Sequence, residues 1–238
     1  MPVQFHLDKV LFLDIETVPQ YASYKEQPDF LQQLWDKKAK NISRLDESFE
    51  ELFQRAGIYA EFGKIICISV GTIKHIINQK TLRIKSFYGD DEKTILIQFS
   101  ELLDQHFNSE QNRLCAHNGK EFDFPYICRR LLVNNLPIPD ILDIQGKKPW
   151  EINHLDTMEL WKFGDYKHYT SLELLAHTLG IQTPKDDIDG SEVAKVYWKN
   201  NDIQRIVAYC QKDVITIAQI MLKYLRMSLL NKKEIVFV

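Results

Sequence analysis

Two carboxylates two residues apart, Asp14 and Glu16, directly follow the apolar run Val10–Leu13. A short continuous apolar run is typical of a central strand that is buried on both faces. Residues two apart on a strand point to the same face, so both carboxylates would meet where this strand ends. Aligned carboxylates repel, and a buried pair needs a proton or a cation between them. Oxygen ligands of this kind suit Mg²⁺ or Mn²⁺, although a solvated loop start would show the same residues.

A second candidate group lies in the last part of the chain, where helical spacing predicts a helix over residues 202–226. The apolar residues with this spacing are Ile203, Ile206, Val207, Val214, Ile217, Ile220 and Met221. Tyr209 and Asp213 are four residues apart and therefore share one face of the helix. An Asp beside an apolar stripe needs a partner, because an unpaired buried charge is costly. The alternative is a surface Asp with a tyrosine packed below it.

A third group lies between Ala116 and Pro125, after one expected strand and before one expected helix. Ligands of open α/β sheets usually bind at such connections. The segment contains Asn118, Phe122 and Asp123. On its own, Asp123 is typical of a carboxylate at a helix start, since Pro125 suits the first helical turn.

Taken together, the three groups resemble the motifs of the DEDD superfamily of 3′-to-5′ exonucleases, in particular the proofreading exonuclease domain of family-B DNA polymerases. The matching residues are Asp14 and Glu16 in the first motif, Asn118, Phe122 and Asp123 in the second, and Tyr209 and Asp213 in the third. Their order also agrees, and the similarity extends over about residues 10–225. The other branch of the superfamily has a histidine five residues before the last Asp, where this chain has Ala208, so the resemblance is to the tyrosine branch. We expect a stand-alone relative without a polymerase.

The resemblance implies hydrolysis of phosphodiester bonds at single-stranded DNA 3′ ends with two divalent metal ions, Mg²⁺ or Mn²⁺. It makes Asp14, Glu16 and Asp213 ligands of the metal that binds the attacking water. Asp14 would bridge to the second metal, which Asp123 would reach directly or through water. Tyr209 would position the water, because an unperturbed phenol titrates at about 10 and is neutral at pH 7. The residues expected to contact the terminal nucleotide are Thr17, Asn118 and Phe122, the last against a sugar or a base.

Two alternatives stay open. The substrate could be RNA, because the superfamily includes ribonucleases and recognition of the 2′-hydroxyl has no short sequence motif. A protein of the same fold that binds nucleic acid without catalysis would typically lack one of the four acids, and all four are present. The basic pairs Arg129-Arg130, Lys147-Lys148 and Lys167-His168 either contact phosphates or form a solvated surface.

Alternating strands and helices in the second half of the chain indicate an α/β sheet. Strands are expected at residues 10–13, 64–73, 81–88, 113–117 and 152–155, with Val18-Pro19 interrupting the chain after the first. Helices are expected at 90–107, 125–132, 171–179, 191–199 and 202–226. The resemblance implies a ribonuclease H-like fold, with a five-stranded mixed sheet, helices on both faces and the first three strands antiparallel.

The 238 residues, 45% of them hydrophobic, are expected to form a single domain over 1–238. Residues 20–62 form a helical insertion that is too short for a core of its own. The net charge of −3 excludes a strongly basic protein that coats nucleic acid, but it does not exclude a local basic groove. Four separated cysteines without zinc-ligand spacing favour a reducing compartment. With no signal peptide and no apolar span, we expect a cytoplasmic protein without a membrane partner.

Overall fold

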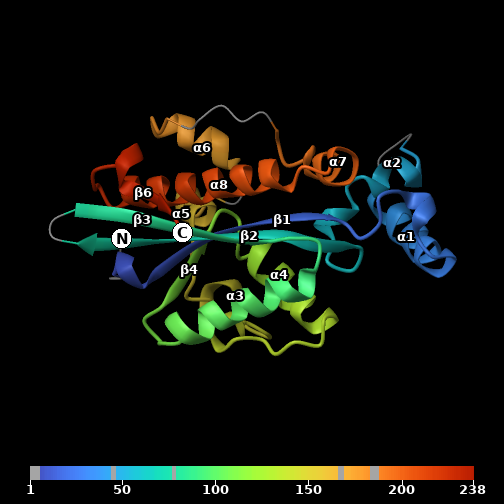
Figure 1. Ribbon diagram of the computed structural model, residues 1–238, viewed down its shortest axis with the longest axis horizontal. Coiled ribbons are helices and arrows are strands. Elements are labelled where there is room, and N and C mark those ends of the chain that lie inside the picture. The colour runs from blue at the N-terminus through green and yellow to red at the C-terminus, as the bar shows by residue number, and fades with distance from the viewer. Residues whose placement is uncertain (1–5, 44–46, 77–78, 166–168, 183–187) are drawn as a thin grey trace.

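The structure, a computed structural model, describes residues 6–43, 47–76, 79–165, 169–182 and 188–238. In this part of the chain a six-stranded mixed sheet has helices on both faces (Figure 1). The strands are β1 Val10–Pro19, β2 Gly63–Ile76, β3 Gln79–Tyr88, β4 Arg113–Ala116, β5 Leu155–Asp156 and β6 Ile235–Phe237. The helices are α1 Asp29–Ile42, α2 Phe49–Phe53, α3 Glu92–His106, α4 Asp123–Val133, α5 Thr157–Lys162, α6 Leu172–Thr178, α7 Val193–Lys195 and α8 Ile203–Tyr224.

The strand order β5-β4-β1-β2-β3-β6 confirms the expected ribonuclease H-like arrangement with one strand added. β1, β2 and β3 are antiparallel neighbours, while β4 runs parallel to β1 and β5 runs parallel to β4. The sixth strand, β6, pairs in parallel with β3 over Leu82–Ile84. The prediction of five strands missed it because three residues are too few for a periodic pattern.

The interruption expected at Val18-Pro19 is wrong, because β1 continues to Pro19 and pairs with β2 from Phe12 to Pro19. The register of this pair shifts between Glu16 and Thr17, which is a β-bulge on β2. Bulges bend a strand and often lie beside functional sites. Pro19 is tolerated because it is the last residue of β1. Its missing N–H therefore does not interrupt the hydrogen-bond ladder within the strand.

The two faces of β1 belong to different cores. Leu11, Leu13 and Ile15 pack with α3 and α4, whereas Phe12 packs with α8. Because side chains alternate along a strand, Asp14 and Glu16 share the α8 face with Phe12. The close approach of α8 depends on Gly71 of β2, where a Cβ would lie 2.9 Å from Val214 Cγ1.

Residues 20–62 do bury a small core, contrary to the expectation. Trp35 packs edge-on against Phe53 and Phe62, with ring centroids 5.4 and 5.1 Å apart. Aromatic side chains bury so much surface each that a few of them suffice for a cluster of this size. The α1–α2 segment lies at the end of the sheet opposite the two chain ends (Figure 1).

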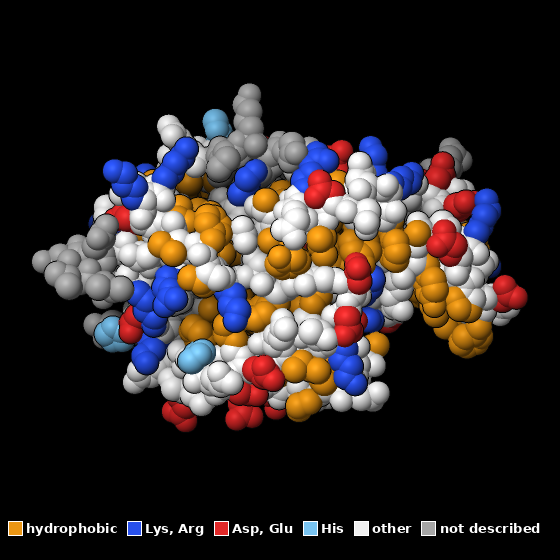
Figure 2. Space-filling model, in the orientation of Figure 1, with side chains coloured by type: hydrophobic (Ala, Val, Ile, Leu, Met, Phe, Trp, Pro, Cys, Tyr) orange, Lys and Arg blue, Asp and Glu red, His pale blue; other side chains and the backbone are white. Residues whose placement is uncertain are grey.

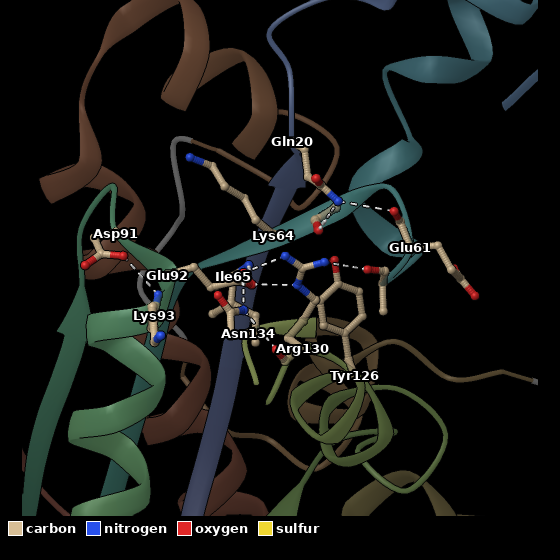
Figure 3. A network of polar contacts seen from close by, with 12 residues as sticks. Gln20, Glu61, Lys64, Ile65, Asp91, Glu92, Lys93, Tyr126, Arg130 and Asn134 are labelled. Atoms are coloured by element: carbon tan, nitrogen blue, oxygen red, sulfur yellow. Dashed lines mark hydrogen bonds and ion pairs between the residues drawn. The ribbon is translucent and has the colours of Figure 1, made fainter. Parts of the chain in front are cut away.

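A buried ion pair joins α3, α4 and the start of β2 (Figure 3). The carboxylate of Glu92 accepts hydrogen bonds from Arg130 Nε at 2.8 Å and Nη2 at 2.6 Å, and from Ile65 N at 2.7 Å. Arg130 Nη1 donates to the carbonyl oxygen of Ala60 at 2.8 Å. Arg130 is therefore a buried structural residue, neither a phosphate contact nor part of a solvated surface.

The other basic residues considered as phosphate contacts differ in their surroundings. Arg129, Lys147 and Lys148 are exposed, whereas Lys167-His168 lie outside the described residues. All four cysteines are free, as expected. Among the described residues, no helix combines the length and the apolar character needed to cross a bilayer.

We expect Arg130→Met to lower the free energy of unfolding by about 3–5 kcal/mol, because it leaves the Glu92 carboxylate buried without its cation. The exposed neighbour provides the control, since Arg129→Met should change stability by less than about 0.5 kcal/mol. Urea denaturation of both variants measures the difference. Similar small losses in the two variants would show that the ion pair does not hold these elements together.

Candidate active site

Asp123 joins Asp14 and Glu16 where β4 leaves β1. Within β1, only Val10–Phe12 pair with β4, and the following residues of β1 extend beyond β4. At that edge the backbone N–H of Ile15 donates a hydrogen bond to the Asp123 carboxylate. Asp123 is the buried first residue of α4, and the positive end of a helix dipole favours a carboxylate there. The Asp123 carboxylate is therefore fixed between β1 and α4.

Asp213, on α8, completes the cluster. Burial raises the pKa of both Asp14 and Glu16 well above the usual values, and the next largest cause for each is the charge of Asp213. Burial also raises the pKa of Asp123 to about 7, with further contributions from Asp156 and Asp213. Repulsion of this kind requires short distances. The four acids selected from the sequence therefore lie close enough for their charges to interact.

The chemistry of this cluster fits a divalent cation. Asp14 Oδ2 is buried and has no hydrogen-bond partner in the described ranges, an arrangement that costs free energy unless a ligand or proton compensates it. Carboxylate oxygens of Asp14 and Glu16 and the Sγ of Cys210 lie within 4.8 Å of one another. Burial raises the pKa of Cys210, which remains a thiol, and its Sγ contacts the Asp14 carbonyl oxygen at 3.4 Å. The remaining donors are hard oxygens, which suit Mg²⁺ or Mn²⁺.

Asp156 holds the loop of the second motif, a role that the sequence analysis missed. Its carboxylate accepts hydrogen bonds from Asn118 N at 3.0 Å and Lys120 N at 3.1 Å. It also caps α5 by accepting from Met158 N and Glu159 N. An Asp at the end of an expected strand and before a helical segment is an N-cap signal, which could have identified it.

Asn118 has a positive φ of 61°, a conformation that asparagine tolerates better than most residues. Its side-chain Oδ1 is buried without a hydrogen-bond partner among the described residues. The next residue, Gly119, has no room for a Cβ, which would meet the side chains of Ala116 and Phe124. Asn118 therefore presents an unsatisfied carbonyl group in a tightly constrained turn.

Three further residues selected from the sequence lie around this cluster. Tyr209 is on α8, one turn before Asp213, and packs against a cluster that includes Val18 of β1. The Thr17 side chain forms a hydrogen bond with the phenol of Tyr126, on α4. Phe122 is partly buried, and its ring centroid lies 5.4 Å from that of Tyr126. The Thr17 hydroxyl is thus engaged within the protein.

Comparison with known proteins agrees with this site. Residues 58–234, more than half of the chain, match the model of a family described as predicted 3′-5′ exonucleases related to the exonuclease domain of PolB. The chain belongs to this family of 3′-5′ exonucleases, as its motifs predicted. Asp123, Tyr209 and Asp213 lie within the matched range, whereas Asp14 and Glu16 precede it.

Among solved structures, the chain is similar to E. coli Exonuclease I, crystallised in complex with a dT13 oligonucleotide. The two are 12% identical, and the TM-score is 0.37. The match covers 85% of this chain and 41% of the other, so the chain spans less than half the length of that protein. No curated protein sequence matches the chain.

The pKa of Asp123 predicts how the stability of the metal-free protein depends on pH. Between pH 3.8 and about 7 the folded state keeps a proton on Asp123 that the unfolded state releases. The free energy of unfolding therefore falls as the pH rises through this window. Urea denaturation in a chelating buffer should show that Asp123→Asn removes part of this fall, while Asp104→Asn, at an exposed position, does not. Equal slopes for wild type and Asp123→Asn would contradict the raised pKa.

Proposed function

We propose that the protein is a metal-dependent 3′-5′ exonuclease that acts on single-stranded DNA ends. The observation that carries the proposal is the convergence of four carboxylates from β1, α4 and α8, with one Asp14 oxygen buried and unsatisfied. A neutral ligand would not offset the repulsion among four acids in a partly buried site. Divalent cations would offset it, and a phosphodiester substrate binds together with such cations. Family membership supplies the direction of cleavage.

Each side chain then has a defined task. Asp14, Glu16 and Asp213 would hold one cation, and Asp14 and Asp123 would hold a second. Such ions, when bound, would acidify a water molecule and would offset negative charge on the attacking and leaving oxygens of an in-line displacement. The Tyr209 phenol would hydrogen-bond the attacking water and align it with the phosphorus. The water oxygen bonds to phosphorus while the bond to the preceding O3′ breaks, which releases a nucleoside 5′-monophosphate and a strand with a new 3′-hydroxyl.

The nucleotide contacts follow from the geometry around the acids. The free Oδ1 of Asn118 can accept a hydrogen bond from a terminal hydroxyl or a base. The partly buried ring of Phe122 offers an apolar surface to a sugar or a base. Neither contact distinguishes DNA from RNA, because neither requires or excludes a 2′-hydroxyl.

The experiment that tests the proposal is cleavage of labelled DNA and RNA, each single- and double-stranded, with Mg²⁺, Mn²⁺ or a chelator. We expect stepwise shortening of single-stranded DNA from its 3′ end with either metal, and none with the chelator. Faster cleavage of RNA would make RNA the substrate and would leave the proposed mechanism unchanged. Binding without cleavage under every condition would favour the non-catalytic alternative.

We expect Mg²⁺ or Mn²⁺ to raise the melting temperature, because a cation that binds only the folded state stabilises it by mass action and relieves the carboxylate repulsion. Asp14→Ala removes the proposed bridging ligand and should lose most of this increase. Asp104→Ala, which removes an exposed acid from α3, should keep it. Differential scanning fluorimetry with increasing metal measures all three proteins. An equal increase in wild type and Asp14→Ala would show non-specific stabilisation.

The water-positioning role of Tyr209 predicts different effects for two substitutions on α8. Tyr209→Phe keeps the ring packing and loses one hydrogen bond to the water, so cleavage should slow by about 10- to 1,000-fold. Asp213→Ala removes a ligand and should abolish measurable cleavage. Single-turnover cleavage at saturating Mn²⁺ measures both, and calorimetry should show that Tyr209→Phe still binds metal. An unchanged rate in Tyr209→Phe would exclude the positioning role, and undiminished cleavage by Asp213→Ala would exclude the site.

A further inference from the structure

A basic groove lies on the side of the sheet away from the acids. It has a volume of about 570 Å³ and is formed by β2 and β3, the end of α3 and the residues before β1. Its basic residues are Lys9, Lys74, Arg83 and Lys85. Asp8 contributes the one acidic side chain among the lining residues, and Leu102 and Phe107 contribute apolar surface. Figure 2 shows Lys and Arg side chains gathered on the part of the molecule that carries the two chain ends in Figure 1.

The strand register places this groove apart from the active site. Asp14 lies opposite Ser69 of β2, whereas the groove begins at Val70 and extends to Lys74. Lys74 is five residues beyond Ser69, or about 17 Å along the strand. Val70 packs on the α3 side, so Thr72 and Lys74 face that side too, while Asp14 faces α8. The groove is thus a separate surface on the opposite face of the sheet.

The basic side chains of the groove have no ion-pair partner within the described part of the chain. Lys9, Lys74, Arg83 and Lys85 form no ion pair with a described acidic residue; the ion pairs that do occur lie elsewhere. Lys74 Nζ approaches only the backbone carbonyl of Asp8, at 3.4 Å. Lys85 Nζ lies 4.8 Å from the centroid of the Phe87 ring. In a protein with a net charge of −3, such a group of exposed cations points to an anionic ligand.

A polar group in the groove also lacks a partner. Thr72 Oγ1 is buried and has no hydrogen-bond partner among the described residues. Thr72 lies directly opposite Arg83 in the β2–β3 ladder, and Lys85 follows two residues later on the same face. The exposed side chains of Arg83 and Lys85, which share this face of β3, are donors that suit phosphate oxygens.

We propose that this groove is a second nucleic-acid site, which binds the phosphate backbone of a single strand outside the active site. Arg83 and Lys85 recur at about 7 Å along β3, a spacing at which successive phosphates of an extended strand can be contacted. The apolar side chains of Leu102 and Phe107 offer a surface against which sugars and bases can pack. The proposal rests on nucleic acid being the substrate class, but not on the metal mechanism.

Fluorescence anisotropy with a labelled oligothymidylate of about 20 nucleotides tests the proposal, with a chelator present to prevent cleavage. The test variant is Arg83→Gln/Lys85→Gln. The control, Lys37→Gln/Lys40→Gln, removes two exposed lysines from α1 at the opposite end of the molecule (Figure 1). We expect the test variant to bind roughly tenfold more weakly, with the slope of log K against log salt smaller by about 1.4, whereas the control matches wild type.

An unchanged Kd in the test variant would overturn the proposal, and would leave an acidic peptide as the ligand class to examine. Equal losses in both variants would overturn it as well, because they would indicate unspecific attraction. A second measurement uses the p-nitrophenyl ester of thymidine 5′-monophosphate, which is too small to reach the groove. Both variants should hydrolyse it with Mn²⁺ at the wild-type rate. If the wild-type protein does not hydrolyse this ester, the proposed catalytic function is wrong. The anisotropy measurement still tests whether the groove binds a nucleic-acid strand.

Discussion

Repulsion among four carboxylates beside the middle of β1 is the constraint around which the rest of the structure is arranged. The strand and the two helices that carry these acids are held in place by contacts outside the acidic cluster. Gly71 lets α8 approach the sheet, and the Glu92–Arg130 ion pair anchors α4 to α3 and β2. Asp156 holds the loop before α4 through two backbone amides. Packing of the two hydrophobic cores thus supplies the free energy that keeps like charges together.

The residues proposed to do chemistry stand in strong local patterns of the sequence. An apolar strand before Asp14, helical spacing around Asp213 and a strand–loop–helix connection before Asp123 each placed one acid on a defined element. Their meeting in space was not derivable from periodicity, and the resemblance to a known exonuclease family supplied it. The structure then gave the physical link, a hydrogen bond from Ile15 N–H to Asp123.

What the sequence did not reveal depends on contacts between distant residues or on segments too short to show a pattern. Asp156 acts through backbone amides almost 40 residues away, and Arg130 is recognisable as structural only once Glu92 is opposite it. The core of residues 20–62 depends on Trp35 meeting Phe62 across a turn of the chain. β6 has only three residues, and its pairing with β3 became visible only in three dimensions.

We propose that the four acids form a cation site that acts on a phosphodiester. Anomalous diffraction from crystals soaked with Mn²⁺ and a nucleoside 5′-monophosphate tests it most directly. We expect manganese peaks about 2.0–2.3 Å from carboxylate oxygens of Asp14, Glu16, Asp123 and Asp213, with the nucleotide phosphate beside them. Manganese bound only at other residues, with these carboxylates hydrogen-bonded to one another through shared protons, would contradict it.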